Sequence, residues 1–335
     1  EEITVVTSAR GDATNELEAI LEKAVSKKDY SLAFEKFKEY QLKPECIVDF
    51  SEEFLKLETI FEGVSLLGDY SQKIKDEVLA QGELLSIKTV ASLLKQKNIT
   101  ANSVDSRFLI ITDENFGNAQ PITAVSRENV ISFFKKSKNT INIVSGFIAS
   151  NKKGITTTLG RNGSNYTAAL LANYLDADEL QNYTHVSGIY TANPDLVADA
   201  KKIEQLSFSE ANELANFGAT ILHAKTIINL LEKNINLRIL NTFNKEDKGT
   251  LITAESSTKG IKSISTIDNV ALLNFEGRGL LGKVGVDARI FKTLSDRNIS
   301  ISIIAQGSSE RGIGLIIDAD KAQEAVAALE KEFEN

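Results

Sequence analysis

Residues 156–175 read TTTLGRNGSNYTAALLANYL, and this stretch sets the fold class. A β-branched run enters a turn that contains Gly160 and Gly163, and a buried, alanine-rich helix is expected from Tyr166 to Leu175. A strand that passes through a glycine-rich turn into a helix is a building unit of α/β proteins. The backbone N–H groups at the start of such a helix favour an anion, because the helix itself leaves them without a partner.

Arg161 lies within this turn and offers a forked hydrogen-bond donor, which suits a carboxylate or a phosphate. The same spacing also fits an ordinary strand-to-helix turn in which Ser164 caps the helix. Spacing alone leaves both interpretations open.

The region before this stretch continues the α/β pattern. The β-branched run Ile3–Ser8 stops at Gly11, and a helix is expected to begin near Thr14. Residues 14–98 show mainly helical periodicity, and one helix is expected from Leu84 to Leu94, after a glycine. Further strands are expected at Phe108–Thr112, Ile141–Val144 and Leu237–Asn241, and further helices at 127–136, Ser207–Asn216 and Thr220–Leu231.

The C-terminal part has a different organisation, and a Ser/Thr/Lys-rich patch at 255–260 is the expected linker. The pattern beyond it predicts a βαββα series, which is a ferredoxin-like unit without its last strand. Such a unit keeps an unpaired edge, which we expect further sequence or another chain to cover. We expect two domains, 1–258 and 259–335. The strands are expected at Val270–Phe275, Ile299–Ile304 and Gly312–Asp318, and the helices at Lys283–Asp296 and Lys321–Phe333.

Composition excludes several classes of function. The 335 residues are 42% hydrophobic and 25% charged, as in globular proteins, and their net charge of −8 argues against nucleic acid as a partner. No apolar run approaches the roughly 20 residues that cross a bilayer, and the N-terminus does not resemble a signal peptide. A structural zinc site is not expected from one cysteine and two histidines. We therefore expect a cytoplasmic protein that needs no metal except magnesium carried by a nucleotide.

The motifs occur together across the whole chain, in the order in which aspartokinases carry them. The chain resembles that family, and its last part resembles an ACT regulatory domain. The resemblance implies an amino-acid-kinase α/β/α sandwich followed by a ferredoxin-like ACT domain. The matching segments are Ser8–Asn15 (S-A-x-G…T-N/D), Gly82–Ser86 (G-E-x-x-S), 106–117, Thr158–Asn165 (similar to G-R-G/N-G-S-D), Thr184–Pro194 (T-D-V-x-G-x-Y-T-x-D-P) and 210–223 (ending F-G-A-K-V-L-H).

The resemblance implies a substrate site for L-aspartate. Arg161 would bind the α-carboxylate, Thr14 and Ser164 would add hydrogen bonds, and Glu83 would pair with the ammonium group. Asn165 stands beside the substrate where the family has Asp. The side-chain carboxylate would attack the γ-phosphorus of ATP in line, with magnesium on the nucleotide.

The resemblance also implies a nucleotide site, lined by Thr184, Tyr190 and the turn 219–221, which includes Thr220 and Ile221. Three positions depart from the family there: His185 replaces Asp, Asp195 replaces Arg, and Thr220 replaces Lys. The family's K-F-G-G-T-S strand does not occur in this sequence. Because lost cations weaken phosphate binding, a catalytically degenerate sensing or scaffolding subunit is an alternative to an active kinase. Glutamate or carbamate kinases fit poorly, since they lack this combination of motifs.

The ACT resemblance implies a bound feedback amino acid, with threonine favoured over lysine. Gln306 stands in the effector loop, and Gly279 and Leu280 precede the first ACT helix, where amides can cap a carboxylate. A homo-oligomer through ACT domains is expected, with no nucleic acid and no membrane as partner. The sequence leaves open whether a second ACT unit or a dehydrogenase domain follows it.

Overall fold

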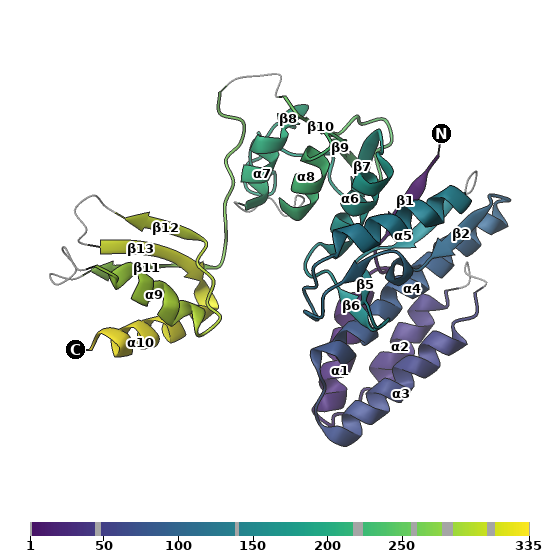
Figure 1. Cartoon of the computed structure of the whole chain (residues 1–335), viewed down its shortest axis with the longest axis horizontal. Helices are drawn as coiled ribbons and strands as arrows, with labels where there is room; N and C mark the ends of the chain where they lie inside the picture. Colours follow the sequence, from purple (N-terminus) through teal and green to yellow (C-terminus); the bar gives the residue numbers. More distant parts are fainter. Residues whose placement is uncertain are drawn as a thin grey trace. The chain divides into compact units, whose positions relative to one another are not determined.

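The structure is a computed structural model that describes residues 2–43, 48–137, 141–216, 224–255, 260–276, 284–306 and 312–334. The chain divides into two compact units, Glu1–Ile264 and Ser265–Asn335 (Figure 1). This division lies shortly after the predicted domain boundary at 258/259.

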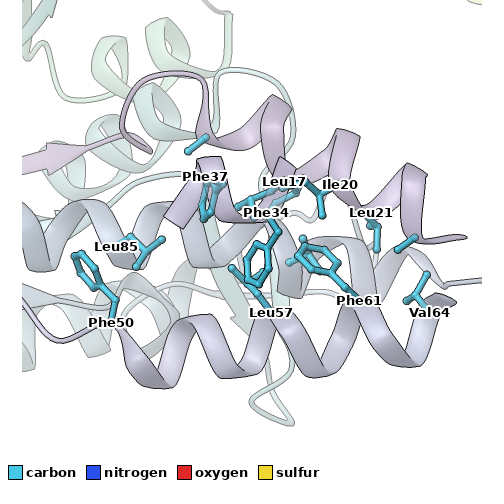
Figure 2. Close-up of a cluster of buried hydrophobic side chains, with 14 residues drawn as sticks. Leu17, Ile20, Leu21, Phe34, Phe37, Phe50, Leu57, Phe61, Val64 and Leu85 are labelled. Atoms are coloured by element: carbon cyan, nitrogen blue, oxygen red, sulfur yellow. The ribbon is translucent and has the colours of Figure 1, made fainter. Parts of the chain in front are cut away.

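The first unit begins with a short strand and then four helices that share a core. Aromatic and aliphatic side chains from all four helices fill it, and Figure 2 shows Phe34, Phe61 and Leu57 at its centre. The Phe34 and Phe61 rings meet edge to face, with centroids 5.4 Å apart. The elements are β1 (Thr4–Thr7), α1 (Ala13–Val25), α2 (Ser31–Gln41), α3 (Ser51–Leu67) and α4 (Gln72–Gln96).

A parallel sheet of order β1-β4-β2 lies between two layers of helices. Successive side chains of a strand point to opposite faces. Accordingly, Ile143 of β4 packs with α4 residues, whereas Val144 packs with residues of α5 and α6. This alternation gives the three-layer α/β/α arrangement and confirms the predicted fold class. The elements are β2 (Ala101–Val104), β4 (Ile141–Ser145), α5 (Thr123–Lys136) and α6 (Gly163–Leu175).

Two further sheets complete this unit. One has the order β3-β5-β6, and the other has the order β7-β9-β10-β8 and packs with α7 and α8. Strands β7 and β9 are parallel, so their carboxyl ends lie at the same edge. The elements are η1 (Ser106–Phe108), β3 (Ile111–Thr112), β5 (Ile148–Asn151), β6 (Thr156–Thr158), β7 (Glu179–Thr184), β8 (Gln205–Ser207), α7 (Phe208–Asn216), α8 (Ala224–Leu231), β9 (Asn236–Asn241) and β10 (Thr250–Thr253).

The second unit is the predicted ferredoxin-like ACT fold without its last strand. Its antiparallel sheet has the order β11-β13-β12, and Ile290, Leu315 and Leu329 lie in a core between sheet and helices. Within the described residues, β11 pairs only with β13, so its other edge is unpaired. The elements are β11 (Val270–Glu276), α9 (Val286–Ser295), β12 (Ile303–Gln306), β13 (Gly312–Asp318), η2 (Ala319–Lys321) and α10 (Ala322–Phe333).

Several expected elements were wrong at their bounds. The helix predicted from Leu84 is the second half of α4, which runs unbroken through Gly82. A Cβ added to Gly82 would lie 3.2 Å from the Ala9 Cβ, a tight contact, so Gly82 marks close packing and not a helix start. The strand predicted at Ile299–Ile304 begins only at Ile303, because Ile299 is buried where the chain leaves α9.

The segment predicted as the strand Phe108–Thr112 is a 3₁₀ turn capped by Asp105 and followed by a two-residue strand. Sequence patterns also missed five strands, which are short or partly polar: β2, β5, β7, β8 and β10.

Candidate active site

Glu83 lies on α4 beside the turn that follows β1. The residue is 2% exposed, and its carboxylate accepts a hydrogen bond from the backbone N–H of Ala9. Its Oε2 is buried and has no hydrogen-bond partner within the described residues. Thr7, two residues before Ala9, also has a buried side-chain oxygen without a partner in that part of the chain. Two buried side-chain oxygens without a hydrogen-bond partner in the described part of the chain, one from Glu83 and one from Thr7, therefore belong to residues beside the turn that follows β1.

The charge of Glu83 follows from this burial. Desolvation raises the pKa of its carboxyl to about 8, although the Ala9 hydrogen bond acts in the opposite direction. No lysine or arginine pairs with Glu83 within the described residues. At neutral pH the ligand-free carboxyl is thus mostly protonated. A cation brought against Oε2 would favour its ionised form.

The turn predicted to bind an anion lies against the loop that follows β4. An added Cβ on Gly146 would lie 2.5 Å from the Ser164 Oγ, and one on Gly163 would lie 2.7 Å from the Phe147 ring. The Gly146 N–H donates to the carbonyl of Thr7, over 2.9 Å. The start of α6 is therefore fixed next to the end of β1. Phe147 itself has φ +66°, a strained conformation for a bulky residue.

The alternative in which Ser164 caps α6 does not match the structure. The residue before the helix is Asn162, in a left-handed conformation at φ +58°, and it makes no side-chain cap bond. Left-handed backbone at Asn162 turns the chain into the helix, which begins at Gly163. The Ser164 hydroxyl is consequently not used as a cap at the helix start.

The other predicted substrate residues lie at the starts of α1 and α6 and in the turn before α6. Thr14 lies in the first turn of α1, directly after the buried Ala13, and is half-buried. Ser164 and Asn165 are half-buried in the first turn of α6. Arg161 is exposed and has no ion-pair partner within the described residues. Its guanidinium therefore lies on the solvent side of the turn and not inside a closed pocket.

The predicted nucleotide residues follow β7 at the carboxyl edge of its sheet. Thr184 ends β7 and its carbonyl accepts the Thr242 N–H over 2.8 Å, whereas His185 and Asp195 are exposed. Gly188 has φ +133°, and an added Cβ would lie 2.4 Å from the Thr250 Oγ1. Tyr190 is half-buried and forms an isolated bridge with a facing residue. Thr220 and Ile221, predicted beside them, lie outside the described residues.

The linker that precedes the second unit is bonded to this same loop. Ser263 Oγ donates to the Tyr190 carbonyl over 2.9 Å, and the Ile264 N–H donates to the Thr191 carbonyl over 2.9 Å. Lys262 lies 3.7 Å from Glu210, the capping residue of α7. No sequence pattern predicted these contacts.

Gln306 is exposed at the end of β12. The other two predicted effector residues, Gly279 and Leu280, lie outside the described residues. No group of three His, Cys, Asp or Glu side chains that could hold a metal ion occurs within the described ranges. None of the helices in those ranges is both long and apolar enough to span a membrane.

Sequence reasoning missed Asp76, which has the most complete set of partners near the turn. Its buried carboxylate accepts four hydrogen bonds, from Gly117, Gln72 and twice from Thr158. Desolvation raises its pKa, against the effect of these donors. A single Asp in a helical pattern carries no local signal for such a role.

Comparisons with known proteins agree with this architecture. The amino acid kinase family model matches residues 1–241, and an ACT domain model matches residues 273–333. A bifunctional aspartokinase/homoserine dehydrogenase of Haemophilus influenzae is 34% identical over 84% of this chain and 35% of its own length. Lysine-sensitive aspartokinase 3 of Escherichia coli is 32% identical over 78% of this chain and 60% of its own length. This chain thus spans between about a third and 60% of these relatives.

A solved structure shows the same resemblance. Escherichia coli aspartokinase III in complex with lysine and aspartate superposes with a TM-score of 0.76 at 28% identity, over 97% of this chain and 76% of that one. The family model covers most of the first unit, and the solved structure aligns with 97% of the chain. The chain belongs to the amino acid kinase family, with an ACT domain after the kinase domain and aspartokinases as its homologues.

Proposed function

We propose that this chain phosphorylates the side-chain carboxylate of L-aspartate with ATP. The observation that carries the proposal is Glu83, a buried carboxylate with one unpartnered oxygen beside the turn after β1. An isolated buried carboxylate is unfavourable, and an amino acid's ammonium group would satisfy it. The Escherichia coli relative was solved with aspartate bound, which supports this choice of ligand.

The remaining substrate contacts in this proposal come from the turn at α6. Arg161 binds the α-carboxylate from the solvent side, and Thr14, Ser164 and Asn165 contribute hydrogen bonds. The free side-chain carboxylate has an ordinary pKa of about 3.9, so it is ionised and needs no strong base. One of its oxygens forms the new bond to the γ-phosphorus while the bond to the β,γ-bridging oxygen breaks. The products are an acyl phosphate and ADP.

The nucleotide site of the proposal is the loop after β7, lined by Thr184, His185, Tyr190 and Asp195. Loops at the carboxyl ends of parallel strands are common ligand sites in α/β folds. A related aspartokinase III structure contains aspartate and ADP, which supports ATP as co-substrate. Magnesium is expected to arrive on the nucleotide phosphates. Thr220 and Ile221 stay predicted members of this site.

One observation favours a second candidate, a relative that binds aspartate but transfers no phosphate. Asp195 presents an exposed carboxylate on the nucleotide loop, where the family resemblance places an arginine. A negative charge there opposes phosphate binding. A cytoplasmic location stays a prediction for either candidate.

Two measurements separate the candidates. In the first, the full chain is incubated with aspartate and magnesium–ATP, and the acyl phosphate is trapped with hydroxylamine. In the second, magnesium–ATP is titrated by calorimetry. We expect aspartate-dependent hydroxamate and nucleotide binding. Aspartate binding without any nucleotide binding at millimolar concentration would instead establish the second candidate.

We further propose feedback control by an amino acid bound to the ACT unit, with threonine as effector and Gln306 as one of its contacts. Gly279 and Leu280 remain predicted contacts, and a homo-oligomer through ACT domains remains a prediction. In this proposal, effector binding acts on the nucleotide loop through the linker, whose hydrogen bonds to the Tyr190 and Thr191 carbonyls connect it to that loop. Threonine should raise the Tm of the chain; stabilisation by lysine alone would refute threonine as effector.

A further inference from the structure

The turn that carries Arg161 is held by a buried carboxylate on α4. Asp76 is fully buried, and no lysine or arginine pairs with it within the described residues. Its Oδ2 accepts the Gly117 N–H at 2.9 Å and the Thr158 N–H at 3.0 Å, and its Oδ1 accepts the Thr158 hydroxyl at 3.1 Å. A fourth donor is the Gln72 side-chain amide, at 3.2 Å. A charge buried at this depth is costly, so its full set of donors requires an explanation.

The donors Gly117 and Thr158 belong to the two backbone segments that frame the turn, whereas Gln72 lies on α4 itself. Thr158 is the last residue of β6, directly before the turn, and its carbonyl accepts the Ala119 N–H over 2.9 Å. Gly117 lies in the neighbouring loop between β3 and α5, and the next residue, Asn118, lies against Gly160: a Cβ added to Gly160 would be 2.7 Å from the Asn118 Oδ1. Asp76 therefore fixes both segments that contact the residue immediately before Arg161.

We propose that Asp76 is a positioning residue, which holds the 158–164 turn so that Arg161 meets the α-carboxylate of the substrate. This inference rests on the aspartate site proposed above. Asp76 does not itself contact the ligand. It acts through Thr158 and Gly117. The backbone N–H groups of both residues donate to the same Asp76 carboxylate, and these shared bonds hold the two segments in one position relative to each other.

The charge of the carboxylate strengthens these bonds. An ionised carboxylate offers acceptor sites on both oxygens and donates nothing. In Asp76→Asn the acceptor becomes neutral, so the bonds from the two backbone N–H groups lose their charge assistance, and an NH₂ group at the Oδ1 position requires the Thr158 hydroxyl and the Gln72 amide to turn and accept from it. The side chain keeps its size, but weaker bonds hold the turn, which gains freedom.

The test measures L-aspartate binding by calorimetry, together with backbone amide exchange, on the full chain. Asp76→Asn should weaken aspartate binding at least about tenfold, or roughly 1.4 kcal/mol, and leave magnesium–ATP affinity unchanged. Exchange of the Gly117 and Thr158 amides should become faster. Thr158→Val should weaken aspartate binding in the same direction, and Thr158→Ser, which retains the hydroxyl, should restore it.

Glu53→Gln is the matched control, because Glu53 is a buried carboxylate on α3 whose partner is Lys88, outside the turn. It should lower Tm without changing aspartate affinity. Asp76→Asn that binds aspartate like the wild type would overturn the inference, as would equal losses of aspartate and ATP affinity. A wild-type chain that binds no aspartate refutes the proposed function instead. In that case the exchange measurement still decides the inference, since unaltered exchange in Asp76→Asn overturns it and faster exchange supports it.

Discussion

Aspartate binding should release a proton from Glu83. In the ligand-free chain, burial raises the pKa of this carboxyl to about 8, so at pH 7 about 0.9 of the molecules carry the proton. An ammonium group placed against the unpartnered Oε2 favours the ionised carboxylate. Binding at pH 7 should therefore release close to one proton per aspartate, and at pH 9 almost none.

The assay is calorimetry at one pH in buffers of different ionisation enthalpy, because a released proton adds the buffer's heat to the observed enthalpy. The slope of observed enthalpy against buffer enthalpy counts the protons. Glu83→Gln should show no slope and far weaker binding, and Glu53→Gln should behave like the wild type. Observed enthalpies that are equal in all buffers at pH 7, with aspartate bound, would refute the assignment of the ammonium to Glu83.

The same pKa predicts how stability depends on pH without ligand. The folded-state pKa lies above the ordinary value of 4.5, so folding favours the protonated form. The stability that this group contributes is complete below about pH 4.5 and is lost as pH rises toward 8, by about 1.4 kcal/mol per pH unit. At pH 7, Glu83→Gln should therefore raise the free energy of unfolding of the ligand-free chain by up to about 3 kcal/mol. A lower free energy of unfolding in this variant at pH 7 would contradict the raised pKa.

Three further predictions follow from the packing. Gly146→Ala should lower aspartate affinity at least about tenfold in calorimetry, because its Cβ would come 2.5 Å from the Ser164 Oγ and displace the start of α6; unchanged affinity would contradict this geometry. Gly63→Ala should raise the free energy of unfolding, measured in urea, by about 0.5–1 kcal/mol, since no atom lies within 4 Å of the added Cβ and the residue is helical; a lower free energy of unfolding would contradict the open space around Gly63. Phe61→Ala should cost about 3–5 kcal/mol in the same assay, because the ring is fully buried in the core of α1–α4; a cost under about 1 kcal/mol would contradict that packing.

Sequence patterns predicted the fold well in segments whose pattern is typical of a single kind of structure. The strand–turn–helix at 156–175 and the βαββα series of the second unit are both present. Errors arose where tertiary packing overrides local signals. Gly82 looks like a helix start, but it lies in the middle of α4 because α4 packs closely on Ala9. Ser164 looks like a cap, but the left-handed Asn162 turns the chain instead.

Site residues were predictable only where a family motif marks them. The structure places Glu83 beside the turn after β1 and leaves Arg161 exposed. The roles of these residues remain predictions until binding is measured. Asp76 could not be found from sequence, because its significance depends on donors more than 40 residues away at Gly117 and 82 away at Thr158.

Asp76 and Glu83 together explain why a long, unbroken α4 is useful at this site. They lie on one helix at positions i and i+7, two turns apart, and therefore on nearly the same face. The first carboxylate is satisfied by protein donors and holds the turn before α6. The second lacks a partner at Oε2 and lies beside the turn after β1. A break in α4 at Gly82 would move Glu83 relative to Asp76, so in the proposed substrate site the position of Glu83 relative to the turn that Asp76 holds depends on the continuity of this helix.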